Sequence, residues 1–440
     1  MTVKIPKRIA TAILNSLKGG VVPRVGLGYI AVGREAEINA LLNDVEIIED
    51  GGATFRFVVG KYGSGKSFLL QTMRTHVMDK GFVVVDADLS PERRLMGTKG
   101  QGLATYKELV QNMSTNTKPD GGALPLILEK WIFNIQSEII KTNQYDAESE
   151  EFTKAVSSRI FEVINDIQGM VHGFDFAKVI SIYWDAYRQA DDEKKSKVIK
   201  WFRGEYTTKT EAKNHLGINI IVTDDNWYEY IKIFAMFLVK AGYRGMLLLV
   251  DELVNIYKIP NSITRQYNYE KILTMYNDTL QGKAKYLGII MGGTPQCIED
   301  TRKGVFSYEA LKSRLETGRF TTEDTRDLLA PIIKLNPLSN EEMYVLIEKL
   351  SEIHANLYNY EKTITQEELI DFLKIEYSRV GSNQNITPRE IIRDFIELIN
   401  IIHQNPNITI SEIVGGEEFK FVENTIDEEK IHEDFADFKL

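Results

Sequence analysis

Residues 58–70 constrain the fold more than any other stretch, because they read V-V-G-K-Y-G-S-G-K-S-F-L-L. They contain the spacing G-x-x-x-x-G-K-[ST], in which glycines let backbone N–H groups surround a polyphosphate. The mostly apolar run before the motif predicts a strand, and the apolar residues after it predict a helix whose N-terminus attracts phosphate. The sequence therefore predicts a phosphate-binding loop (P-loop). Its candidate nucleotide-binding residues are Gly60, Gly63, Ser64, Gly65, Lys66, Ser67 and Phe68.

Two of these side chains have distinct expected roles. Lys66 would reach the outer phosphates, and the Ser67 hydroxyl would bind Mg²⁺. ATP and Mg²⁺ are therefore the expected cofactors. The structural alternative is a glycine-rich turn that merely precedes a core helix.

A second motif, which is acidic, lies about 185 residues after the P-loop. The apolar run at residues 246–250 predicts a buried strand, and Asp251 and Glu252 follow it directly. At the carboxyl end of such a strand, Asp251 is suited to the Mg²⁺ shell and Glu252 to orienting an attacking water as a general base. The alternative is a strand that ends in two solvated acids.

Two weaker candidates follow the next predicted strand, at residues 286–291. Thr294 stands at its end, where a hydroxyl could contact the attacking water or the γ-phosphate, although Thr294 and Pro295 could also form only a turn. Arg314 lies at the end of the following predicted helix. It could act as an arginine finger toward a neighbouring subunit, or it could be a solvated surface residue.

Arg389 is the remaining candidate. Thr387 as N-cap, Pro388 at the first helical position and Glu390 two residues later predict a helix start, which places Arg389 in the first turn. From a helical lid this arginine could reach the phosphates. A solvated arginine in an ordinary first turn is the alternative.

The stretch between the second and third predicted strands, about 155 residues, has mostly helical periodicity. All four tryptophans fall in it, and their helical spacing favours a second, separate hydrophobic core. Residues 97–118 are rich in Gly, Thr, Asn and Lys, which predicts an exposed loop. After residue 338 the pattern is helical only.

Composition narrows the class of protein. The chain has 440 residues with 43% hydrophobic residues, one cysteine (Cys297) and no apolar run that could span a membrane, so we expect a cytoplasmic protein without disulfides. Residues 411–440 hold ten acidic residues against three lysines, a charge of −7, whereas the first 34 residues hold six basic and no acidic residues. The net charge of −10 is unlike that of a basic DNA-binding domain, and direct DNA contact stays open.

Taken together, G-R-E at residues 33–35, the P-loop, Asp251-Glu252, Thr294, Ser313-Arg314 and T-P-R at residues 387–389 resemble an AAA+ ATPase of the initiator-like branch. The segments D-A-D-L-S-P-E-R-R-L, G-Y-R-G-M-L-L-L-V-D-E-L, F-S-Y-E-A-L-K-S-R-L and N-I-T-P-R-E-I-I-R-D-F narrow the resemblance. They are similar to the ATP-binding proteins of bacterial BREX phage-defence systems, the BrxC/BrxD type. The length is close to that of the shorter member.

This resemblance implies an α/β fold of the AAA+ type, with a five-stranded, mostly parallel sheet, a large helical insertion and a C-terminal helical lid. The expected segments are an N-terminal helix with the first part of the ATPase core (1–96), the insertion (97–244), the second part of the core (245–337), the lid (338–404) and an acidic tail (405–440).

The implied function is ATP hydrolysis coupled to conformational change in a defence complex that acts on DNA. The implied partners are copies of the same chain or other defence proteins, such as a methyltransferase, a helicase or a phosphatase-like protein. The alternative is a scaffold or switch that binds ATP, hydrolyses it little and assembles partner proteins.

Overall fold

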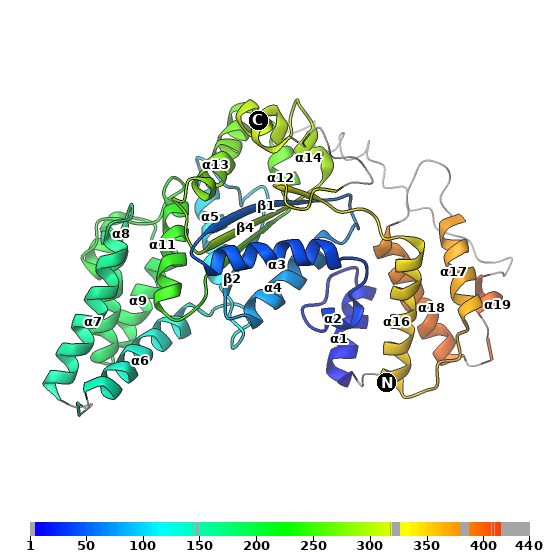
Figure 1. Ribbon diagram of the computed structural model, residues 1–440, viewed down its shortest axis with the longest axis horizontal. Helices are drawn as coiled ribbons and strands as arrows, with labels where there is room; N and C mark the ends of the chain where they lie inside the picture. The colour runs from blue at the N-terminus through cyan, green and yellow to red at the C-terminus, as the bar shows by residue number, and fades with distance from the viewer. Residues whose placement is uncertain are drawn as a thin grey trace. The chain divides into compact units, whose positions relative to one another are not determined.

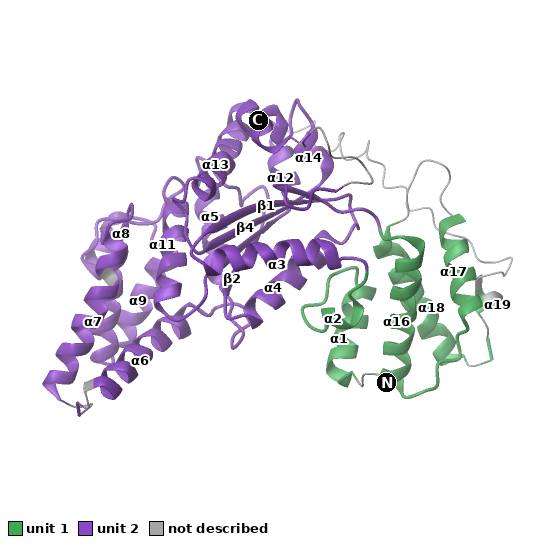
Figure 2. Cartoon of the chain, viewed as in Figure 1, with its two compact units in different colours: residues 1–32, 338–440 green, residues 33–337 purple. Residues whose placement is uncertain are grey.

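The computed structural model describes residues 5–143, 145–146, 149–316, 318, 326–378, 387–405, 407–408 and 410–414. The chain divides into two compact units (Figure 2), of which one comprises residues 33–337 and the other residues 1–32 together with 338–440. Most of the predicted acidic tail lies outside the described residues. Within the described part, no helix has the length and apolar character needed to cross a membrane.

The unit of residues 33–337 is built on a five-stranded sheet (Figure 1). The strands are β1 (Ala53–Val59), β2 (Val83–Asp88), β3 (Met246–Asp251), β4 (Leu287–Gly293) and β5 (Ile332–Lys334). Their order in the sheet is β2-β3-β4-β1-β5, and every pairing is parallel. The predicted five-stranded α/β fold is confirmed, and it is consistent with a P-loop NTPase.

Alternating residues of the strands face two different helical layers, as expected for a parallel sheet buried on both sides. One face, which includes Val58 and Leu247, packs on α3 (Glu35–Glu49) and α4 (Lys66–Asp79). The opposite face, which includes Phe57, packs on α5 (Gln101–Gln111) and α13 (Ser262–Leu280). The sheet is therefore the middle layer of a three-layer unit.

Among the described residues, a block of seven helices connects β2 to β3. They are α5, α6 (Leu124–Asn143), α7 (Glu150–Gln168), α8 (Gly173–Arg188), α9 (Asp192–Phe202), α10 (Lys209–Leu216) and α11 (Trp227–Lys240). The prediction that the four tryptophans are core residues is confirmed, since each is at most 5% exposed. The expected separate core is wrong, because one continuous cluster of buried side chains runs from this block onto the sheet face.

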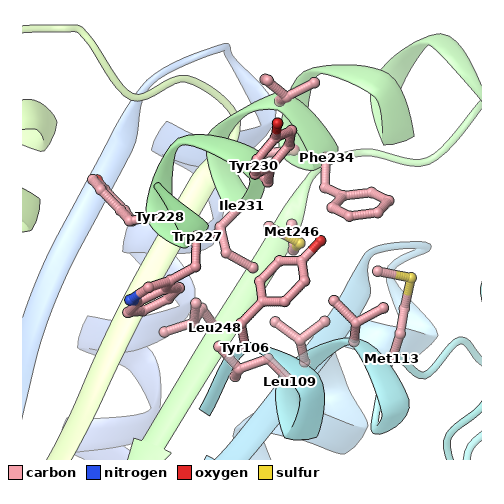
Figure 3. Close-up of a cluster of buried hydrophobic side chains, with 14 of the residues drawn as sticks. Tyr106, Leu109, Met113, Trp227, Tyr228, Tyr230, Ile231, Phe234, Met246 and Leu248 are labelled. Atoms are coloured by element: carbon pink, nitrogen blue, oxygen red, sulfur yellow. The ribbon is translucent and has the colours of Figure 1, made fainter. Parts of the chain in front are cut away.

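The prediction of an exposed loop at residues 97–118 is also wrong, because α5 occupies its middle. Tyr106 and Leu109 of α5 are fully buried beside Trp227 of α11 and Leu248 of β3 (Figure 3). The Tyr106 hydroxyl donates a hydrogen bond of 2.7 Å to the Phe202 carbonyl. The polar composition of this stretch concealed a narrow apolar stripe at helical spacing.

Shorter elements complete this unit after β3 and β4. They are α12 (Val254–Tyr257), α14 (Pro295–Glu299), a 3₁₀ helix (Val305–Ser307) and α15 (Glu309–Leu315).

The second unit is helical in its described part. It contains α1 (Lys7–Lys18), α2 (Leu27–Ile30), α16 (Asn340–Tyr358), α17 (Gln366–Ser378), α18 (Pro388–Gln404) and α19 (Ile410–Val414). The N-terminal α1 packs against α16 and α18, which lie more than 300 residues later in the chain. The predicted helix start at Thr387 is confirmed, with a capping box between Thr387 and Glu390, and α16 begins with a second capping box between Ser339 and Glu342.

Candidate nucleotide-binding site

The candidate site lies at the carboxyl ends of the four adjacent strands β2, β3, β4 and β1. Asp88 of β2 pairs in register with Asp251 of β3, and Val59 of β1 pairs with Gly293 of β4. The P-loop leaves β1 at this edge and enters α4. Because the strands are parallel, the P-loop and the acidic motif meet at this edge although they are far apart in sequence. Open parallel sheets bind their ligands at this kind of edge.

The P-loop has the backbone that its glycines permit. Gly63 and Gly65 adopt φ angles of 76° and 88°, a region that side chains with a Cβ rarely adopt. A Cβ added at Gly60 would lie 2.2 Å from the Ser64 Oγ, so a larger residue here would displace the Ser64 side chain. Lys66 then begins α4, and the half-buried Phe68 lies in its first turn.

The Lys66 side chain lies over the P-loop. Its Nζ donates hydrogen bonds of 2.8 Å to the Gly60 carbonyl and 2.9 Å to the Lys61 carbonyl. The same ammonium lies 5.5 Å from the centre of the Tyr62 ring. The positive charge is thus held over the loop rather than directed into bulk solvent.

Ser67 of the P-loop and Asp251 of the acidic motif are in direct contact. The Ser67 Oγ donates a hydrogen bond of 3.0 Å to Asp251 Oδ2, and Asp251 Oδ1 accepts one of 2.8 Å from the Glu252 N–H. A hydroxyl and a carboxylate are hard oxygen donors, which fit Mg²⁺. Among the described residues, no group of three or more His, Cys, Asp or Glu side chains could hold a metal ion. If Ser67 and Asp251 held Mg²⁺, its other positions would be open to phosphate oxygens and water.

Glu252 has an unusual backbone for its residue type. Its φ angle is 61°, in the left-handed region, and its side chain is exposed. The chain turns at this point, because the Asn255 N–H donates a hydrogen bond of 3.0 Å to the Glu252 carbonyl. A non-glycine residue held in this conformation costs roughly 1–2 kcal/mol, and such strain is concentrated at functional sites.

Asp88 is a site carboxylate that the motif analysis missed. Its pKa is raised to about 6, mainly by desolvation, then by the negative charges of Asp251, Asp86 and Glu252, and Arg93 opposes the shift. The available signal was the run V-V-V-D-A-D, which ends in acids as the strand before Asp251 does. The shift thus reflects burial first and, after it, the carboxylates that lie near Asp88 at this edge of the sheet.

Thr294 follows β4 directly and is buried beside the P-loop strand. Its hydroxyl caps α14 by accepting a hydrogen bond of 3.4 Å from the Cys297 N–H. The buried Cys297 thiol donates back to the Thr294 carbonyl at 3.0 Å, and burial raises the pKa of this thiol. This geometry fits the turn alternative, and a sensor role for Thr294 stays a prediction.

The two candidate arginines have the following local surroundings. Arg314 is exposed near the end of α15, where its guanidinium donates a hydrogen bond of 2.6 Å to the Ala310 carbonyl. Arg389 belongs to the other unit, in the first turn of α18, where its Cδ would lie 3.5 Å from a Cβ added at Gly20. Their roles as finger and lid arginine stay predictions.

A family-wide sequence model of the BREX system ATP-binding protein BrxC/D matches residues 5–418. No curated protein matches the chain. The match includes the P-loop, the acidic motif and nearly all of the described helices. This chain therefore belongs to the BrxC/D family of BREX system ATP-binding proteins.

Proposed function

We propose that the chain binds ATP with Mg²⁺ at the edge formed by the P-loop and β3, and hydrolyses it to ADP and phosphate. The observation that supports this most is the 3.0 Å contact between Ser67 and Asp251, residues that are 184 positions apart. A glycine-rich turn without a nucleotide function would not require a hydroxyl and a carboxylate to converge beside it.

Each site residue has a role in this proposal that follows from its chemical group. Lys66 and the N-terminus of α4 would neutralise phosphate charge, since both present positive potential at the loop. Ser67 and Asp251 would hold Mg²⁺, which supplies further charge neutralisation when bound. Glu252, exposed next to Asp251, would accept a hydrogen bond from water and orient it.

The finer architecture also belongs to this proposal. Residues 1–96 would supply an N-terminal helix and the first part of an AAA+ core, and residues 245–337 the second part. Residues 97–244 would act as a helical insertion, and residues 338–404 as a helical lid that bears Arg389 and packs on the N-terminal helix. The parallel sheet and the helical unit after residue 337 support this assignment. An acidic tail would follow from residue 405.

The cellular role that we propose follows from the family. The chain would act in the cytoplasm in an anti-phage defence complex, either with further copies of itself or with other proteins of the system, and it would couple ATP turnover to conformational change at DNA. A second candidate is a nucleotide-dependent scaffold with little hydrolysis. The use of the Thr294 hydroxyl as a helix cap favours it, because a sensor of phosphate loss would then be missing.

Titration of the purified chain with a fluorescent ATP analogue in the presence of Mg²⁺ tests the nucleotide site. Lys66→Ala should weaken binding about tenfold or more, because it removes the charge that lies over the loop. Lys80→Ala is the matched control, since it removes an exposed lysine at the opposite end of α4 from the loop and should leave affinity unchanged. Equal loss in both variants, or no binding by the wild type, would contradict the proposal.

A further inference from the structure

Arg34 is a buried arginine, 5% exposed, that comes immediately before α3. One of its terminal guanidinium nitrogens, NH2, donates a hydrogen bond of 2.9 Å to the Ser64 carbonyl in the P-loop. The same nitrogen donates one of 2.7 Å to the Asn336 carbonyl after β5. This side chain thus joins the P-loop to a segment about 270 residues away.

An ion pair also holds the Arg34 guanidinium in place. Glu37, 2% exposed, lies 3.6 Å from the other terminal nitrogen of Arg34. The same carboxylate accepts a hydrogen bond of 2.9 Å from Arg326, which also donates to the Lys334 carbonyl at 2.8 Å. A buried carboxylate between two guanidinium groups restricts Arg34 to one orientation.

The contact with Ser64 has a direct consequence for the loop. The Ser64 carbonyl and the Gly65 N–H belong to one planar trans peptide unit, so they point in opposite directions. A donor that holds the carbonyl on one side therefore fixes the N–H on the other side. Gly65, with φ 88°, has no Cβ to restrict its side of this peptide, so a hydrogen bond from outside the loop adds a restraint there.

We propose that Arg34 is a positioning residue that sets the affinity of the P-loop for the phosphate chain of its ligand by fixing the peptide between Ser64 and Gly65. This inference rests on the proposed function, since it assumes that the loop binds a polyphosphate. It differs from a direct contact between Arg34 and the adenine base, because a positioning residue acts on any ligand that carries the phosphates.

Isothermal titration of the full chain with inorganic triphosphate and with ATP, each with Mg²⁺, separates these two roles. Arg34→Lys keeps the charge but replaces the planar fork by a single ammonium, which cannot reproduce the same set of contacts. Affinity for inorganic triphosphate and for ATP should fall by the same factor, about tenfold, the scale of one lost hydrogen bond.

Arg56→Lys is the matched control. Arg56 is also a buried arginine, in β1, and it pairs with Asp44 at 2.6 Å and donates to the Ala330 carbonyl at 2.7 Å, away from the P-loop. This variant should lower the midpoint of thermal unfolding without changing affinity for either ligand. A loss of the same size in Arg56→Lys would show that Arg34 acts only through general stability and would overturn the proposal.

Two further outcomes would also overturn it. A loss of affinity for ATP with unchanged affinity for inorganic triphosphate would show that Arg34 contacts the adenine base. Unchanged affinity for both ligands would show that Arg34 does not position the P-loop. If Arg34→Lys does not fold, Glu37→Gln replaces it, because this variant removes the buried charge that holds the Arg34 guanidinium. The affinity for ATP and the affinity for inorganic triphosphate should then fall by the same factor. Failure of the wild-type chain to bind either ligand would instead contradict the proposed function itself.

Discussion

The left-handed backbone conformation of Glu252, the proposed general base, lowers the free energy of unfolding of the protein. Its φ of 61° is a conformation that glycine adopts freely and other residues avoid. The site keeps a carboxylate at this position despite that cost, as expected where a side chain is needed for function.

A comparison of Glu252→Gly with Glu252→Ala tests this point. Both variants lack the carboxylate, so the difference between them isolates the backbone. Glycine relieves roughly 1–2 kcal/mol of strain but loses more entropy on folding, so Glu252→Gly should be more stable than Glu252→Ala by ~0.5–1 kcal/mol. Urea unfolding followed by circular dichroism would measure the difference, and an alanine variant at least as stable as the glycine one would rule out the strain.

Residues within one contiguous motif were predictable from the sequence, because their spacing alone specifies the local geometry. Lys66 and Ser67 belong to this class, and so does Asp251 at the end of its strand. Arg34 does not, since its partners Ser64 and Asn336 are 30 and 302 positions away and no local pattern connects them. Its role depends on the sheet order, which brings the segment after β5 next to the P-loop.

At the scale of elements, the strands and capped helices were predictable, and the polar helix α5 was not. Capping residues such as Thr387 and Glu390 leave a local signature that fixes a helix start. In α5 the buried stripe is narrow and the surrounding residues are those of a loop, so tertiary packing on the sheet decides its conformation.

The helical unit contains a buried histidine with a predictable effect on stability. His354 of α16 is fully buried, its Nδ1 lies 2.8 Å from the Tyr360 hydroxyl and its Nε2 lies 3.2 Å from Asn400 Oδ1. A neutral ring satisfies both contacts by accepting from the hydroxyl and donating to the amide oxygen. Burial lowers the pKa of His354 below its ordinary value of 6.5, the Asn400 hydrogen bond opposes the shift, and the charge of His403 adds to it.

The unfolded chain therefore takes up this proton at higher pH than the folded chain. The stability that His354 contributes is fully present above pH 6.5 and is lost as the pH falls toward the lower folded-state pKa. His354→Gln removes the titration but keeps an amide that can hydrogen-bond. Its free energy of urea unfolding should change less between pH 7.5 and 5.5 than that of the wild type. An equal change in both proteins would contradict the assignment.

At the scale of the whole molecule, the exposed position of Arg314 leads to a prediction about assembly. Its guanidinium contacts only the Ala310 carbonyl among the described hydrogen bonds, and the residue is solvent-exposed. An arginine supplied by a neighbouring subunit can accelerate phosphoryl transfer by roughly 10³ or more. ATP turnover per subunit should therefore rise with protein concentration, and Arg314→Ala should bind ATP normally but hydrolyse it poorly.

Mixing variants distinguishes a finger from a surface charge. Arg314→Ala retains the P-loop lysine and Lys66→Ala retains the arginine, so interfaces that combine the two intact residues should restore part of the activity. Lys312→Ala, which changes a residue two positions earlier in the same helix, is the control and should turn over ATP like the wild type. Wild-type turnover by Arg314→Ala at high protein concentration would show that this arginine has no part in catalysis.

The central claim is that the edge formed by the P-loop and β3 hydrolyses ATP, and the rate of phosphate release by purified wild-type chain and Glu252→Gln tests it most directly. Glu252→Gln should bind ATP within a few-fold of the wild type while its turnover falls roughly 10²-fold or more, because glutamine cannot accept a proton. Glu92→Gln, which alters an exposed acid in the loop after β2, should retain full turnover. Equal turnover by the wild type and Glu252→Gln would contradict the account and favour the scaffold.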